Sequence, residues 1–146
     1  MLSSLASFKS KRDFQRKCRS LRLELVVLFG SRNGENLAIK PDSDLDIAVL
    51  DSEPFSHDRH SDVHGFLFDF FENYDLDFVM FNRADPLFRY EIMRNCQRLY
   101  GDPLKFLEYK SFAFRDYVDS RDLLDLEDAL FRKKFSWIKE ELYGTA

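Results

Sequence analysis

The residues best placed to do chemistry are carboxylates that alternate along predicted strands. Asp44 and Asp46 begin an apolar run, DLDIAVL, that predicts a strand over Asp44–Leu50. Residues two apart on a strand project from the same face, so the two carboxylates are neighbours and repel each other unless a cation offsets their charge. Oxygen ligands suit a hard ion such as Mg²⁺, which keeps waters and takes further ligands from substrate phosphates. The pair therefore predicts a site for a metal-bound nucleoside triphosphate.

A third carboxylate comes from the next predicted strand, Leu76–Phe81. Asp77 is flanked by apolar residues, where a carboxylate packs poorly. It can join Asp44 and Asp46 if its strand lies beside the strand Asp44–Leu50. Three acids can hold two metal ions, one for the attacking hydroxyl and one for the leaving pyrophosphate. Asp75 shares the strand face of Asp77 and is the competing candidate. We prefer Asp77, because Asp75 lies at the mouth of the strand.

A glycine and a hydroxyl residue add a candidate phosphate-binding turn. Gly30 and Ser31 follow the apolar run Leu23–Phe29, which predicts a buried strand. Glycine lets the backbone approach a ligand closely, and the hydroxyl with the following N–H groups can donate to phosphate oxygens. Arg32 either assists there or is simply solvated.

The elements that must position these residues are predicted from periodicity. Apolar residues at helical spacing predict helices over 5–20 and from Val63 to Tyr74, and Asp85-Pro86 and Asp102-Pro103 are typical helix starts. The second of these begins a helical pattern that continues to the end of the chain, with a possible restart at Ser120. A loop is predicted over Asp51–Ser61, and a short extended piece over Arg98–Tyr100. The order predicts an α+β fold, with helices packed on a small mixed sheet.

Length and composition favour one domain. The chain has 146 residues, 45% of them apolar, and a net charge of −4. We expect a single domain over 1–146, with a core at about 9–105 and a C-terminal helical extension at about 103–142. No apolar run is long enough to cross a bilayer, which predicts a cytoplasmic protein without membrane contact. The acidic balance makes a nucleic acid partner unlikely, although residues 1–22 are basic.

The cysteines and histidines offer weaker signals. Cys18 and Cys96 have no metal-binding spacing, which favours two ordinary thiols. His60 and His64 have helical i, i+4 spacing, but they lie in a polar stretch without other ligands, so we do not interpret them as a metal site. The apolar, charged C-terminal pattern fits either packing against the sheet or a partner-binding helix.

The motifs together resemble a known family. The chain contains FGSRNG, then PDSDLDIAVL, then DFVMFNRADPLFRYEI. This order resembles the minimal nucleotidyltransferases (MNT) of the polymerase-beta-like superfamily, over about residues 9–105. The resemblance implies that Gly30 and Ser31 bind the triphosphate, that Asp44 and Asp46 ligate both metals, and that Asp77 is the third carboxylate.

The spacer between the first two motifs departs from the family pattern. Twelve residues separate Ser31 from Asp44, more than the family usually has. The insertion either lengthens a surface loop, which costs little, or displaces the phosphate turn. We expect the catalytic geometry to be intact.

The resemblance also implies an activity. Small MNT proteins resemble the antitoxins of HEPN–MNT toxin–antitoxin pairs, which transfer AMP from ATP to a tyrosine of the HEPN ribonuclease. On this basis we expect two Mg²⁺ ions, replaceable by Mn²⁺, with ATP as substrate and a HEPN toxin as partner. Two alternatives remain: adenylation of a small molecule such as an antibiotic, and a non-catalytic module that blocks a toxin.

Overall fold

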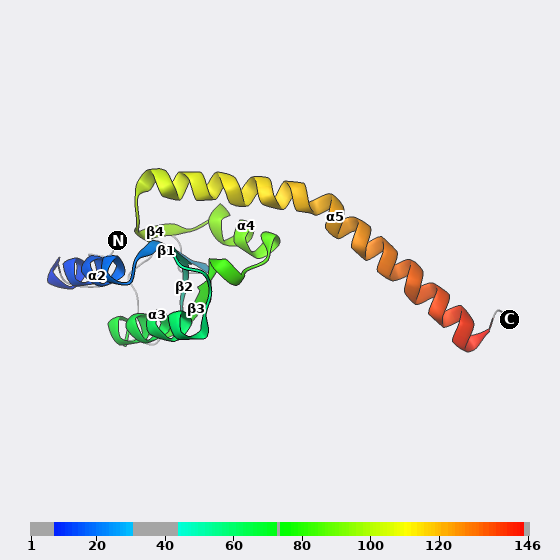
Figure 1. The fold of residues 1–146 in the computed structure, drawn as a ribbon, viewed down its shortest axis with the longest axis horizontal. Helices are drawn as coiled ribbons and strands as arrows, with labels where there is room; N and C mark the ends of the chain where they lie inside the picture. The colour runs from blue at the N-terminus through cyan, green and yellow to red at the C-terminus, as the bar shows by residue number, and fades with distance from the viewer. Residues whose placement is uncertain (1–7, 31–43, 73, 145–146) are drawn as a thin grey trace.

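A four-stranded mixed sheet forms the centre of the molecule. The computed structural model describes residues 8–30, 44–72 and 74–144. The strand order is β3-β2-β1-β4, in which β1 pairs antiparallel with β2 and β4, whereas β2 and β3 are parallel. The predicted α+β fold is therefore confirmed. The elements, labelled as in Figure 1, are α2 (Phe8–Ser20), β1 (Leu23–Phe29), β2 (Asp44–Asp51), α3 (His57–Phe70), β3 (Asp75–Met80), η2 (Phe81–Arg83), α4 (Pro86–Arg94), β4 (Gln97–Tyr100) and α5 (Pro103–Tyr143).

The parallel pair depends on α3, which carries the chain from β2 back to the start of β3. The predicted loop over Asp51–Ser61 is wrong at both ends. Asp51 belongs to β2, and α3 begins at His57. The side chain of Ser56 accepts a hydrogen bond from the backbone N–H of Arg59, so a polar stretch that is typical of a loop is instead a capped first helical turn.

The two faces of the sheet bury separate cores. Helices α2 and α3 cover one face, and α4 with the first part of α5 covers the other (Figure 1). Alternation along β2 sends Ile47 to the first core and Ala48 to the second. The fully buried residues on the first face include Phe14, Cys18, Leu28, Leu45, Ile47, Val63 and Leu67. Those on the second face include Val27, Ala48, Phe81, Ile92, Met93 and Ala113.

Helix α5 is continuous over 41 residues and projects far beyond the sheet (Figure 1). The possible restart at Ser120 does not occur, because one continuous helix passes through this position. Every residue over 121–144 is exposed, so this part does not pack against the sheet, which was one of its two predicted roles. No helix among the described residues is long and apolar enough to cross a membrane.

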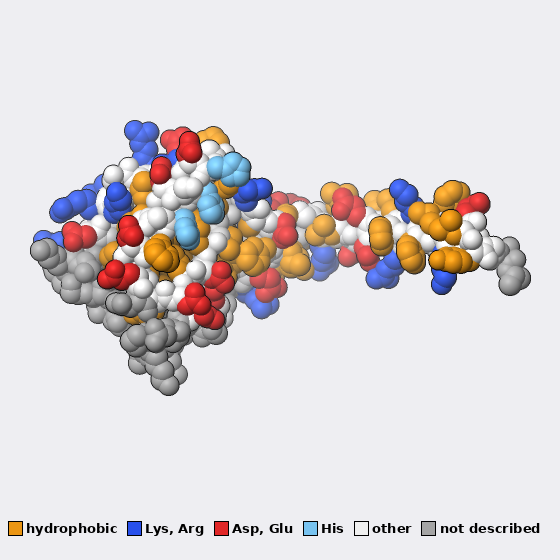
Figure 2. Space-filling model, turned by 90° about the horizontal axis from the view of Figure 1, so that it is seen from below, with side chains coloured by type: hydrophobic (Ala, Val, Ile, Leu, Met, Phe, Trp, Pro, Cys, Tyr) orange, Lys and Arg blue, Asp and Glu red, His pale blue; other side chains and the backbone are white. Residues whose placement is uncertain are grey.

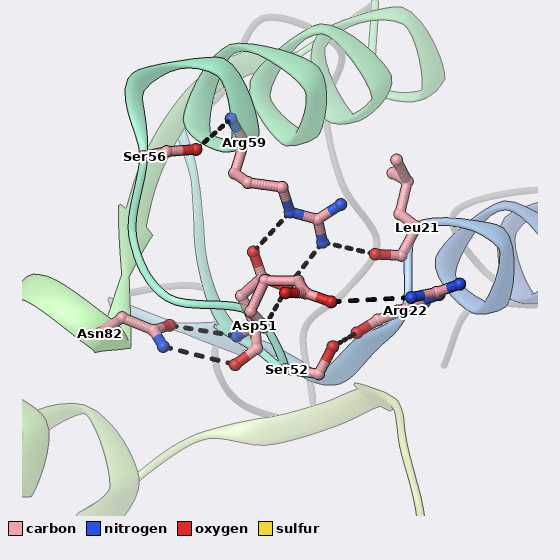
Figure 3. A network of polar contacts seen from close by, with 8 residues as sticks. Leu21, Arg22, Asp51, Ser52, Ser56, Arg59 and Asn82 are labelled. Atoms are coloured by element: carbon pink, nitrogen blue, oxygen red, sulfur yellow. Dashed lines mark hydrogen bonds and ion pairs between the residues drawn. The ribbon is translucent and has the colours of Figure 1, made fainter.

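A buried ion pair fixes the far end of β2 (Figure 3). The Asp51 carboxylate accepts from Arg59 Nε at 2.9 Å and from Arg59 Nη2 at 2.6 Å. The same arginine donates to the carbonyl of Leu21, and the Asn82 amide exchanges two hydrogen bonds with the Asp51 backbone. This network ties the turn between α2 and β1, α3 and η2 to the end of β2, at the opposite end from Asp44.

Candidate active site

The strand register sets four carboxylates side by side. In the parallel pair, Asp44 lies opposite Asp75 and Asp46 lies opposite Asp77. Directly paired residues of neighbouring strands share a face, and so do residues two apart on one strand. All four side chains therefore belong to the sheet face that also carries Ala48. The expectation that the third strand lies beside the second is confirmed.

These carboxylates lie where the face opens to solvent. Asp44, Asp75 and Asp77 are exposed, and Asp46 is half-buried. The prediction that apolar neighbours enclose Asp77 is wrong, because Leu76 and Phe78 pack on the opposite face against the first core. None of the three exposed acids has an ion pair with another described residue. A ligand can reach all of them from solvent.

Gly30, which belongs to the FGSRNG motif, lies beside the row of four carboxylates. Its neighbour Phe29 pairs with Asp46 across β1 and β2. The backbone of Gly30 has φ +82°, and a Cβ built there would lie 2.1 Å from Oδ2 of Asp46. Only glycine adopts this conformation and leaves this space without strain. Gly30 therefore lies against the carboxylate row at a point where a side chain would clash with Asp46.

The four carboxylates suit a hard divalent cation, because they offer oxygen ligands and three of them are exposed to solvent. They lie on one face at the mouth of the parallel pair and supply the type of ligand that Mg²⁺ accepts. Within the described ranges, however, no three His, Cys, Asp or Glu side chains already converge on a point as a finished metal site would require. Substrate phosphates and waters must supply the remaining ligands.

The other predicted residues have different positions. Ser31 and Arg32 lie outside the described residues. His60 and His64 stack on each other, with ring centroids 6.2 Å apart, and both lie against Phe78. Figure 2 shows the histidines grouped on the surface of the domain. They form an aromatic cluster on the side of β3 away from the carboxylates.

A cavity of about 330 Å³ adjoins β3 and contains residues that the sequence analysis missed. Val79, which follows Asp77 on the same face, lines it together with Phe88 and Arg83. The guanidinium of Arg83 lies 4.4 Å from the ring centre of Phe55. A larger cavity, about 560 Å³, lies between α4 and α5 and includes none of the four carboxylates. We assign the site to the carboxylate row, since the larger cavity has no comparable chemistry.

The sequence comparisons identify the family. The family model for polymerase beta nucleotidyltransferases matches residues 14–103, which include Gly30 and all four carboxylates. The chain belongs to this nucleotidyltransferase family. No curated protein matches the sequence with significance.

Solved structures of similar fold come from toxin–antitoxin complexes. The chain resembles the MNT antitoxin in a complex with a tri-AMPylated HEPN toxin from Shewanella oneidensis, with a TM-score of 0.60 and 18% identity over 84% of this chain and 96% of that one. A toxin–antitoxin structure with AMP-PNP gives a TM-score of 0.63 and 18% identity over 83% and 98%. The MntA-HepT complex gives 0.60 and 18% over 84% and 97%.

Proposed function

We propose that this protein transfers AMP from ATP to a tyrosine hydroxyl of a HEPN-type toxin and thereby acts as its antitoxin. The observation that carries the proposal is the register of β2 and β3, which aligns Asp46 with Asp77 beside the Gly30 turn. The similar complexes support the acceptor, because one contains an AMPylated HEPN toxin and another an ATP analogue.

Each carboxylate has a distinct proposed role. Asp44 and Asp46 would hold the metal ions for the triphosphate, and Asp77 would be the third carboxylate ligand. Two Mg²⁺ ions, when bound, neutralise phosphate charge and make the acceptor hydroxyl more acidic. Gly30 permits close backbone approach to the phosphates, while Ser31 and Arg32 donate hydrogen bonds to them.

The proposed transfer is a single displacement at the α-phosphorus of ATP. The acceptor oxygen forms a bond to the α-phosphorus of ATP, and the bond from that phosphorus to the bridging oxygen breaks. Pyrophosphate leaves with the electron pair, and the hydroxyl proton passes to solvent. A tyrosine hydroxyl has a pKa near 10, so it needs activation to attack at neutral pH. The row of acids provides the negative charge that gathers cations at this point.

The experiment uses the full chain, a HEPN-type toxin as acceptor, and ATP labelled at the α-phosphate. We expect label on the toxin, lost when its acceptor tyrosine becomes phenylalanine and lost in EDTA. Label on an aminoglycoside with none on the toxin would instead identify a small-molecule adenylating enzyme. Toxin inhibition without label and without Mg²⁺ binding would identify a non-catalytic binder.

A further inference from the structure

The distal segment of α5, residues 121–143, is a long helix without packing partners among the described residues. Its large apolar side chains are well exposed, from 37% for Ile138 to 81% for Tyr143. Figure 2 shows them as a line of orange side chains along the projecting helix, with both charge signs between them. In proteins, packing of an amphipathic face normally supplies most of the stability of a helix. A binding partner is therefore expected along this segment.

The apolar side chains of the distal segment occupy one broad face. At about 100° per residue, they cover roughly half of the helix circumference. The face consists of Leu123, Leu124, Leu126, Leu130, Phe131, Phe135, Trp137, Ile138 and Leu142. Three charged residues, Glu127, Lys134 and Glu141, lie within it rather than on the polar side, and Glu127 and Lys134 have opposite signs near its middle. Charges inside an apolar face commonly set the register and orientation of paired helices.

Charges of each sign are segregated along the distal segment. Four acids and one base lie between 121 and 128, whereas four bases and no acid lie between 132 and 139. A second identical helix in parallel would set like charges together. In antiparallel orientation, the acidic half of each copy faces the basic half of the other.

The sequence is self-complementary about the midpoint between Leu130 and Phe131. An antiparallel pair centred there sets apolar residues opposite apolar residues and Glu127 opposite Lys134. The opposing apolar pairs are Leu123 with Ile138, Leu124 with Trp137, Leu126 with Phe135, and Leu130 with Phe131. Glu127 and Lys134 oppose each other inside the contact. The pairs Arg121 with Glu140, Asp122 with Lys139, and Asp128 with Lys133 match in level along the two helices but lie more than about 100° from the centre of the contact, on the polar side. Such a two-fold contact repeats each pair twice, as an isologous interface does.

We infer that the distal segment of α5 pairs with the same segment of a second copy of this chain, as an antiparallel two-helix contact centred between Leu130 and Phe131. Each Glu127 then meets Lys134 of the other copy inside the apolar contact. The two nucleotidyltransferase domains lie at opposite ends of the paired helices. This assembly is independent of the proposed catalytic activity.

Analytical ultracentrifugation of the full chain tests the pairing through charge reversal. We expect a dimer for the wild type and at least about a tenfold weaker dimer for Lys134→Glu, which sets two acids together. Glu127→Lys should weaken it equally, and the double variant Glu127→Lys/Lys134→Glu should recover the wild-type affinity within about threefold. Asp125→Lys is the matched control, because Asp125 lies roughly 160° around the helix from Glu127 and should leave the dimer unchanged.

Three results would overturn the inference. The first is a wild-type chain that stays monomeric at high concentration. The second is a dimer that survives both single reversals, and the third is a double variant that fails to recover. A monomer that captures a toxin through this face would likewise exclude self-pairing. Circular dichroism of each variant confirms that the domain is folded, which we expect because the distal segment does not contact it.

Discussion

The two ends of strand β2 use the same residue type for opposite purposes. At one end, the Asp51 side chain is 0% exposed and receives two hydrogen bonds from Arg59. At the other end, Asp44 and Asp46 join the carboxylates of β3 in a row that opens to solvent. A buried carboxylate requires a cation from the protein itself, whereas an open row of carboxylates can take its cation from solution. The same strand therefore has a structural end and an end that we propose is the active end.

The largest expected effect is on stability, at the structural end. Arg59→Met leaves the buried Asp51 carboxylate without its cation, and we expect a loss of about 3–5 kcal/mol in the free energy of unfolding. The carboxylate of Asp51 also raises the pKa of Arg59, which keeps the guanidinium charged. Urea unfolding monitored by circular dichroism measures the change. The control is Glu53→Gln, which removes an exposed pair with Arg22 and should cost at most about 1 kcal/mol.

The next effect is on activity, at the active end. Gly30→Ala forces a side chain into the space of the Asp46 carboxylate, 2.1 Å away, in a backbone conformation with φ +82°. Relief of this clash must move the backbone or the Asp46 carboxylate, and a misplacement of about 1 Å near reacting groups can cost about 100-fold in rate. We expect that loss in AMP transfer, measured with labelled ATP. Gly65→Ala is the matched control, because a Cβ there meets nothing within 4 Å, and full activity in both variants would place the phosphates elsewhere.

A smaller expected effect is on stability at alkaline pH. It comes from Tyr109, a partly buried residue that packs against the second core. Burial raises the pKa of Tyr109 to about 12, with Arg89 lowering it and Asp116 raising it further. A raised pKa means that the folded state keeps the Tyr109 proton up to a higher pH than the unfolded state does. Stability is therefore complete below the ordinary value of about 10 and falls as pH rises towards 12.

Unfolding curves in urea at several pH values across that window measure the loss. Tyr109→Phe should be less sensitive to alkaline pH than the wild type, because phenylalanine has no proton to release. If the wild type and Tyr109→Phe lose the same stability at alkaline pH, the loss comes from titratable groups other than Tyr109. Tyr109 lies against Phe81, so phenylalanine keeps the ring contact between α5 and η2.

Sequence patterns predicted the sheet well because its strands carry apolar runs with clear limits. The run Leu23–Phe29 is β1 as predicted, and β2 extends the prediction by one residue, Asp51. That extension was missed because an acid after an apolar run is typical of a loop. Its burial depends on Arg59, whose contact with it spans two elements and has no local signature in the sequence.

The site was predicted in part. Alternation along each strand indicated which acids share a face, but it could not set Asp46 opposite Asp77, because register depends on the α3 crossover. The contact between Gly30 and Asp46 is also a property of the fold, since a glycine after a strand indicates only a turn. The positions of Val79, Phe88 and Arg83 around the adjoining cavity had no sequence signal at all.

The central claim is that the pair Asp46 and Asp77 is the active end of the sheet. AMP transfer from labelled ATP to the toxin, measured beside Mg²⁺-ATP binding, tests it most directly. We expect Asp77→Asn to reduce transfer by at least about 100-fold while nucleotide binding largely remains, because Asp44 and Asp46 still hold the triphosphate's metal. Asp75→Asn, paired with Asp44 one step further from Gly30, should stay within about threefold of the wild type. An inactive Asp75→Asn beside an active Asp77→Asn would contradict the account.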